Sequence, residues 1–109
     1  MTSKVSVDMA LCSHETTIEV EDKNDGTVSV HIKSSCNHVK EYAKLLTEVK
    51  LDDLYEMKGS KILELATEAR LTPTCLVPVG VFNACWLEVG MISKNLVKTR
   101  PSVCIHFME

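Results

Sequence analysis

The sequence predicts an α+β fold in which an antiparallel sheet of about four strands carries helices on one face. Three segments in the first third of the chain alternate apolar and polar residues, which is the pattern of half-buried strands. From residue 37 onward apolar residues recur every three to four positions, which is the pattern of helices with one buried face. A two-layer domain in the order βββ, two or three helices, β would bury all of these apolar faces.

The three predicted strands cover residues 5–11, 16–22 and 27–33. Asn24-Asp25-Gly26 separates the second strand from the third and is a strong turn signal, because these residue types tolerate the positive φ angles of a tight hairpin. We therefore expect an antiparallel meander whose inward side chains are Val5, Val7, Met9, Leu11, Ile18, Val20, Val28, Val30 and Ile32.

The predicted helices follow in order. The first begins near residue 37, and its apolar stripe continues to Val49. A short helical segment over residues 51–57 precedes a second helix, which Ser60 can cap. A third helix begins at Pro78, since proline suits the first turn.

The last residues of the chain return to a period of two. Val103, Ile105 and Phe107 alternate with Cys104 and His106, which predicts a C-terminal strand that completes the sheet. The outward sides of the first three predicted strands are polar, so we expect helices on one face only.

Length and composition narrow the class of protein. The 109 residues suit a single domain over residues 1–109. The net charge of −3 does not indicate the basic surface that a nucleic-acid-binding protein needs. No apolar run approaches the ~20 residues that a membrane span needs. Five scattered cysteines without a Cys-x-x-Cys pair indicate reduced thiols and not a disulfide framework, so we expect a cytoplasmic protein. An open sheet edge or a polar sheet face could support a homodimer.

Three cysteines occupy junctions between predicted elements. Cys12 follows the first strand, Cys36 follows the third strand and opens a helix, and Cys75 precedes the third helix. The first and third strands of a meander run in the same direction, so Cys12 and Cys36 should emerge at one end of the sheet, roughly 9–10 Å apart. Three thiolates at one place would suit zinc or an iron–sulfur cluster, with His14 or His38 as a further ligand.

Two other interpretations of these cysteines remain open. Cys36 at a helix N-terminus could be an activated nucleophile for thiol or sulfur transfer, because the helix dipole favours a thiolate. Alternatively, all five cysteines could be packing residues of an interaction module without a site, since free cysteine often behaves as a small hydrophobe. Cys85 lies on the apolar stripe of the third helix and is expected in the core, and Cys104 is expected on a solvated strand face.

The chain resembles a family of small, functionally uncharacterised, cysteine-containing domains of methanogenic archaea and anaerobic bacteria. The segments that carry the resemblance are Leu11-Cys12, Ser34-Ser35-Cys36, Cys75-Leu76-Val77-Pro78 and Glu88-Val89-Gly90. The residue after Cys12 is Ser13, where such relatives would have glycine. The resemblance implies that Cys12, Cys36 and Cys75 belong together and that Cys85 and Cys104 do not. It implies no reaction, so our leading hypothesis is a small binding protein with a three-thiol metal site, acting as a carrier, a sensor or an assembly factor.

Overall fold

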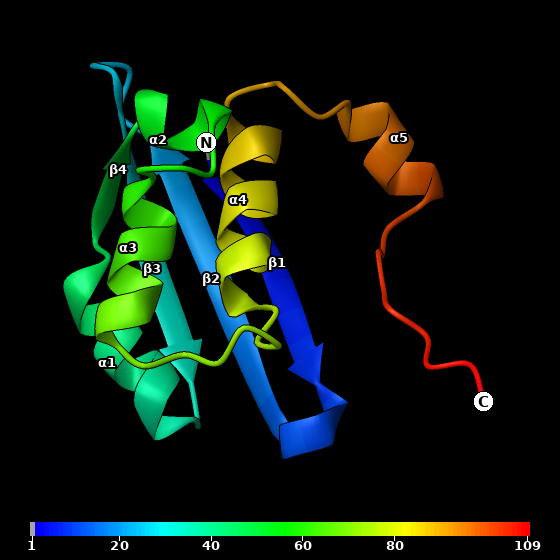
Figure 1. Ribbon diagram of the computed structural model, residues 1–109. Coiled ribbons are helices and arrows are strands. Elements are labelled where there is room, and N and C mark those ends of the chain that lie inside the picture. The colour runs from blue at the N-terminus through cyan, green and yellow to red at the C-terminus, as the bar shows by residue number, and fades with distance from the viewer. Residues whose placement is uncertain (1) are drawn as a thin grey trace.

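The computed structural model describes residues 2–109 and has the predicted α+β architecture (Figure 1). Four strands form one antiparallel sheet in the order β1-β2-β3-β4. Their bounds are β1 Thr2–Met9, β2 His14–Asp22, β3 Thr27–Ser34 and β4 Glu48–Lys50. The helices are α1 Asn37–Leu45, α2 Asp52–Tyr55, α3 Lys61–Glu68, α4 Val77–Glu88 and α5 Lys94–Thr99, and a short 3-10 turn, Ala10–Cys12, joins β1 to β2.

The meander of the first three strands is confirmed. Val5 of β1 lies opposite Ile18 of β2, which in turn lies opposite Ile32 of β3, so apolar residues share one face across the sheet. The predicted turn between β2 and β3 uses left-handed backbone at Asn24, with φ 61°, and at Gly26, with φ 89°. Turn chemistry and strand pattern therefore agree on one register.

The sheet is covered by helices on one face only, as predicted. Ile18, Val28 and Ile32 are buried beneath the helices, whereas Glu19 and His31 on the opposite face are exposed. Figure 1 shows α1 to α4 in front of the sheet. The core therefore lies between the sheet and this helical layer, and the other sheet face remains polar.

Helix α4 runs antiparallel to β1 and is tied to the sheet at both ends. At its end, the Glu88 carboxylate accepts hydrogen bonds from Ser3 Oγ at 2.8 Å and from the Asp22 amide at 3.1 Å. At its start, the Leu76 amide donates to Met9 Sδ at 3.4 Å. The beginning of α4 is thus held next to the end of β1, which positions the cysteine-bearing segments described below.

The fourth strand is not where the sequence pattern placed it. We expected Val49 on the stripe of the first helix, but α1 ends at Leu45 and Val49 lies in β4, opposite Val28. A three-residue strand is too short to show alternation, so its pairing with β3 decides its conformation. The short helix is also smaller than residues 51–57, since α2 spans only Asp52–Tyr55.

The first strand ends earlier than predicted. β1 stops at Met9, and Leu11, which we expected to face inward, is 74% exposed in the 3-10 turn. Ser13 closes this turn in left-handed backbone with φ 57°. Cys12 therefore lies in a tight turn and not on a strand.

The predicted C-terminal strand is wrong. Residues 101–109 have no regular secondary structure, and Val103 and Phe107 are 82% and 76% exposed. Helix α5, which the sequence pattern did not indicate, precedes them and is capped by Ser93, whose hydroxyl accepts from the Leu96 amide. A strand needs a neighbouring strand for its hydrogen bonds, and the segment lies away from the sheet in Figure 1.

Two helix-start predictions are confirmed. Ser60 caps α3 by accepting a hydrogen bond from the Ile62 amide at 3.2 Å, and Pro78 lies in the first turn of α4. Within residues 2–109, no helix combines the length and the apolar character required to cross a membrane.

Candidate functional site

The segments that carry Cys12, Cys36 and Cys75 lie at the same end of the sheet. β1 and β3 both run towards this end, where the 3-10 turn holds Cys12 and where Cys36 is the N-cap residue of α1. Cys75 lies in the loop from α3 to α4, which crosses the same end in Figure 1. Three segments separated by more than twenty residues each are therefore neighbours here.

The electrostatics of Cys75 reflect this proximity. Partial burial raises the pKa of the Cys75 thiol, the Val77 amide lowers it, and the negative charges of ionised Cys36 and Cys12 raise it further. Cys75 therefore lies within electrostatic range of both other sulfurs. Cys36 and Cys75 also pack against the core, while Cys12 is exposed.

The three thiols are neighbours without forming a closed coordination shell. In the part of the chain from residue 2 to residue 109, no three or more histidine, cysteine, aspartate or glutamate side chains are grouped so that they could hold a metal ion. The Cys12 thiol donates instead to the Met9 carbonyl at 3.6 Å. The side chains would have to rearrange before they could share one ligand.

The two histidines named with these cysteines occupy different surroundings. His14 Nδ1 lies 2.8 Å from Ser35 Oγ, which places this ring beside the residue that precedes Cys36. His38 Nδ1 lies 3.3 Å from the carbonyl of Ala69 and donates to it, so this ring faces the end of α3. His14 is thus placed towards the Cys36 segment, and His38 links α1 to α3.

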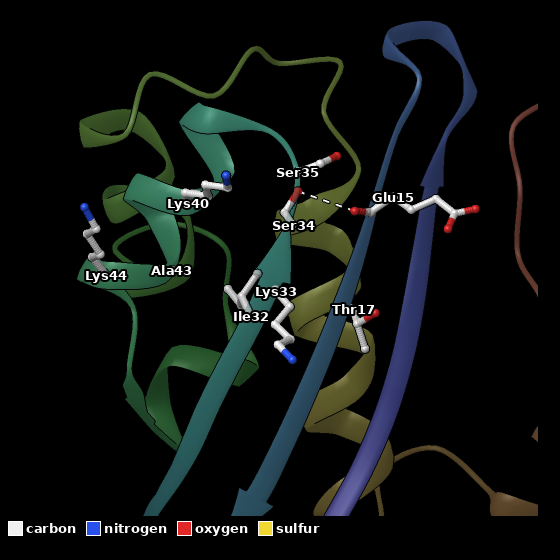
Figure 2. Close-up of a pocket in the computed structure, with 9 residues that line it drawn as sticks. All are labelled: Glu15, Thr17, Ile32, Lys33, Ser34, Ser35, Lys40, Ala43 and Lys44. Carbon is white, nitrogen blue, oxygen red and sulfur yellow. Dashed lines mark hydrogen bonds between the residues drawn. The ribbon is translucent and has the colours of Figure 1, made fainter.

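A groove of about 670 Å³ lies beside the same end of the sheet, between β3 and α1 (Figure 2). Three of its lining side chains are lysines and three are hydroxyl-bearing, so it could attract an anionic group, although Glu15 offsets part of the charge. None of the three cysteines lines it. The residues that line it are Glu15, Thr17, Ile32, Lys33, Ser34, Ser35, Lys40, Ala43 and Lys44.

Sequence reasoning did not find this groove. Lys40 and Lys44 are four residues apart on α1 and share one helix face, which is a recognisable signal. Lys33, on β3, joins them only because the chain turns back on itself between β3 and α1. That turn is a tertiary feature, and charge spacing alone does not predict it.

Comparison with models of protein families identifies the family of this chain. A family of unknown function, DUF6951, matches residues 3–100, which is most of the chain. The chain belongs to DUF6951. No curated protein and no solved structure matches it. Membership in DUF6951 supports the expected kinship with functionally uncharacterised domains, and the description of the family states no reaction.

The two remaining cysteines of this DUF6951 chain lie elsewhere. Cys85 is fully buried in α4, and burial raises its pKa to about 12, as expected of a core residue. Cys104 lies in the C-terminal residues beyond the part that matches DUF6951, and its sulfur is 3.2 Å from His106 Nε2.

Tyr42 lies in the core close to the end of the sheet that carries Cys75. The sequence pattern indicates only that it belongs to the apolar face of the first helix. Its side chain is fully buried, and its hydroxyl donates to the Ile62 carbonyl at 2.8 Å. Burial raises the pKa of Tyr42, and the negative charges of ionised Cys75 and Cys85 raise it further. Tyr42 therefore stays a neutral hydrogen-bond donor behind Cys75.

Alkylation should separate the cysteines by environment. At about pH 8, iodoacetamide should modify the exposed Cys12 and Cys104 within minutes and leave Cys85 intact in the folded protein. Cys75 should react more slowly than a free cysteine, since a raised pKa leaves less thiolate at a given pH. Peptide mass spectrometry after timed quenching measures each rate, and a denatured sample is the control. Rapid native labelling of Cys85 would contradict its core position.

Proposed function

We propose that this chain is a small binding protein in which Cys12, Cys36 and Cys75 together hold zinc or an iron–sulfur cluster. The observation that carries the proposal is that the segments bearing Cys12, Cys36 and Cys75 lie together at one end of the sheet, where the Leu76 amide contacts Met9 Sδ. Thiolates are the ligands that zinc and iron–sulfur clusters prefer, and a bound cation would remove the mutual repulsion of three neighbouring negative charges. A carrier, sensor or assembly role follows from such a site.

The surrounding groups support a site that closes when metal binds. Cys12 lies in an exposed three-residue turn with no buried residue, so this turn can move at little cost in packing. The Cys12 sulfur would exchange its hydrogen bond with the Met9 carbonyl for a metal bond. His14, beside Ser35, is the histidine that we propose as the fourth ligand, whereas His38 would first have to leave Ala69.

Elemental analysis of protein purified without air tests this proposal directly. We expect about one zinc ion or one cluster per chain, and charge-transfer absorbance if the metal is iron. The Cys36→Ser variant should lose the metal, because the serine hydroxyl stays protonated at neutral pH and is a poor ligand for a soft metal. Cys104→Ser is the matched control, since it removes an exposed thiol from the C-terminal residues, which supply no ligand in the proposed site, and should keep full metal content.

The metal contents of these variants can be compared only if both variants keep the native fold. Circular dichroism before and after each substitution verifies it. Air-free protein that contains neither zinc nor iron, or a Cys36→Ser variant that keeps its metal, would refute the proposal. That relatives in DUF6951 share these three cysteines is a further prediction of the same proposal.

A second candidate function rests on the position of Cys36. As the N-cap residue of α1, Cys36 lies at the start of a helix, a position from which reactive cysteines act in thiol or sulfur transfer. The alkylation experiment discriminates between the two candidates. In metal-free protein at about pH 6, labelling of Cys36 much faster than of the exposed Cys104 would favour transfer chemistry.

A further inference from the structure

The last nine residues, 101–109, which we term the C-terminal arm, have the sequence of a strand but no strand partner. Val103, Ile105 and Phe107 recur at every second position and are 82%, 67% and 76% exposed, and Met108 is 94% exposed. A run of exposed large apolar side chains of this kind marks an interaction segment in soluble proteins. Figure 1 shows the arm extending from α5 away from the sheet.

The structure also has a free edge that lacks a strand. Among residues 2–109, β1 is the outermost strand of the sheet and pairs only with β2, so alternate amides and carbonyls along its eight residues point outward without a strand partner there. Its inward residues Val5 and Met9 are partly buried, whereas Val7 between them is buried against α4. Unpaired edges of this length are templates for strand addition.

We propose that the C-terminal arm of one chain adds as a strand to the free edge of β1 in a second copy of this chain, so that two copies exchange arms. The chain presents both halves of the interaction, the loose strand and the open edge. A symmetric exchange satisfies both halves in both copies at once, whereas a different protein would leave either the arm or the edge unpaired. This inference does not depend on the proposed metal site.

The two faces of the arm match the two faces of the sheet. With Val103, Ile105 and Phe107 on the helix-covered side, the arm would extend the apolar surface next to Val5 and Met9 of the partner copy. Cys104 and His106 would then lie on the polar side, which carries Lys4 and Asp8 of β1. A strand has a period of two, so every register of this parity satisfies both faces at once.

The arm can reach outward because α5 holds it clear of the sheet. None of the residues of α5 is buried, and Leu96 in its middle is 56% exposed. The arm supplies no residue of the core, so substitutions in it should leave the fold of the single domain unchanged. This makes the arm a suitable place for test variants.

The mass of the full chain in solution tests the proposal, measured by light scattering during size-exclusion chromatography in reducing buffer at about 100 μM. We expect a dimer for the native chain. The double variant Ile105→Pro/His106→Pro should be monomeric. The amides of adjacent strand residues point to opposite sides, so one of the two prolines always removes a donor to β1. Phe107→Lys should weaken the dimer at least tenfold, since it puts a charge on the apolar face. Cys104→Ser should remain a dimer, which excludes a disulfide between arms.

Hydrogen exchange then locates the contact. In the dimer we expect slowed exchange at the free-edge amides of β1 and at residues 103–108, and both protections should disappear together in Ile105→Pro/His106→Pro. A monomeric native chain would overturn the inference, and so would a dimer that survives Ile105→Pro/His106→Pro. Protection of the arm in a monomer would overturn it as well, because the arm would then pair within its own chain. A dimer without protection at β1 would show that another surface makes the contact.

Discussion

Replacing Ile18 by alanine should lower the free energy of unfolding by about 2–5 kcal/mol. Ile18 is fully buried on β2, an inner strand, and it packs beneath α4. Deleting its outer carbons removes buried apolar surface and leaves a cavity that a close-packed core cannot fill. Domains of this size are stable by about 5–15 kcal/mol, so the variant should unfold at a much lower urea concentration.

The single tryptophan, Trp86 on α4, provides the fluorescence signal for this measurement. Glu19→Ala is the matched control, because Glu19 is the next residue on the same strand and is exposed on the polar face. Its effect should stay within about 0.5 kcal/mol. Equal unfolding midpoints for the two variants would contradict the assignment of the faces of β2.

Replacing Gly80 by valine should lower the free energy of unfolding by about 3 kcal/mol, at the upper end of the range for overpacking. Gly80 is the point where α4 approaches the sheet most tightly. A Cβ atom at this position would lie 2.6 Å from Val7 Cγ2 and 3.0 Å from Ile18 Cδ1, and valine adds two further carbons. Since Val7 is itself branched at Cβ and stiff, α4 would have to move away from β1.

A double-mutant cycle separates this collision from a general effect on the helix. Val7→Ala removes the nearest carbon, so Gly80→Val should be less damaging in the Val7→Ala background than in the native chain. The coupling should be about 1 kcal/mol or more, measured by urea unfolding. Strictly additive effects would mean that the glycine is needed for a reason other than its closeness to Val7.

The candidate thiol site was only partly predictable from the sequence. Chain direction in a meander places Cys12 and Cys36 at one end of the sheet without any coordinates. The arrival of Cys75 at the same end depends on how the loop before α4 docks, and the contact between the Leu76 amide and Met9 Sδ holds it there. The orientation of His38 towards Ala69 likewise depends on how α1 packs against α3. Loop docking and helix packing involve residues far apart in the sequence, and local patterns carry no information on them.

Local patterns determined the α+β class, the three-stranded meander and the starts of α3 and α4, because the hydrogen bonds and caps that build helices and tight turns join residues close in sequence. Tertiary structure alone decided which short segments are strands. Glu48–Lys50 has no strand pattern and is a strand because it lies beside Thr27–Ser29. Residues 103–108 have a clear strand pattern and are not a strand, because no segment within residues 2–109 of the same chain pairs with them. The hydrogen bonds of a strand are made to another segment, which is often distant in the sequence. An alternating pattern therefore makes a segment suitable for a strand, but the segment becomes one only where a neighbouring strand pairs with it.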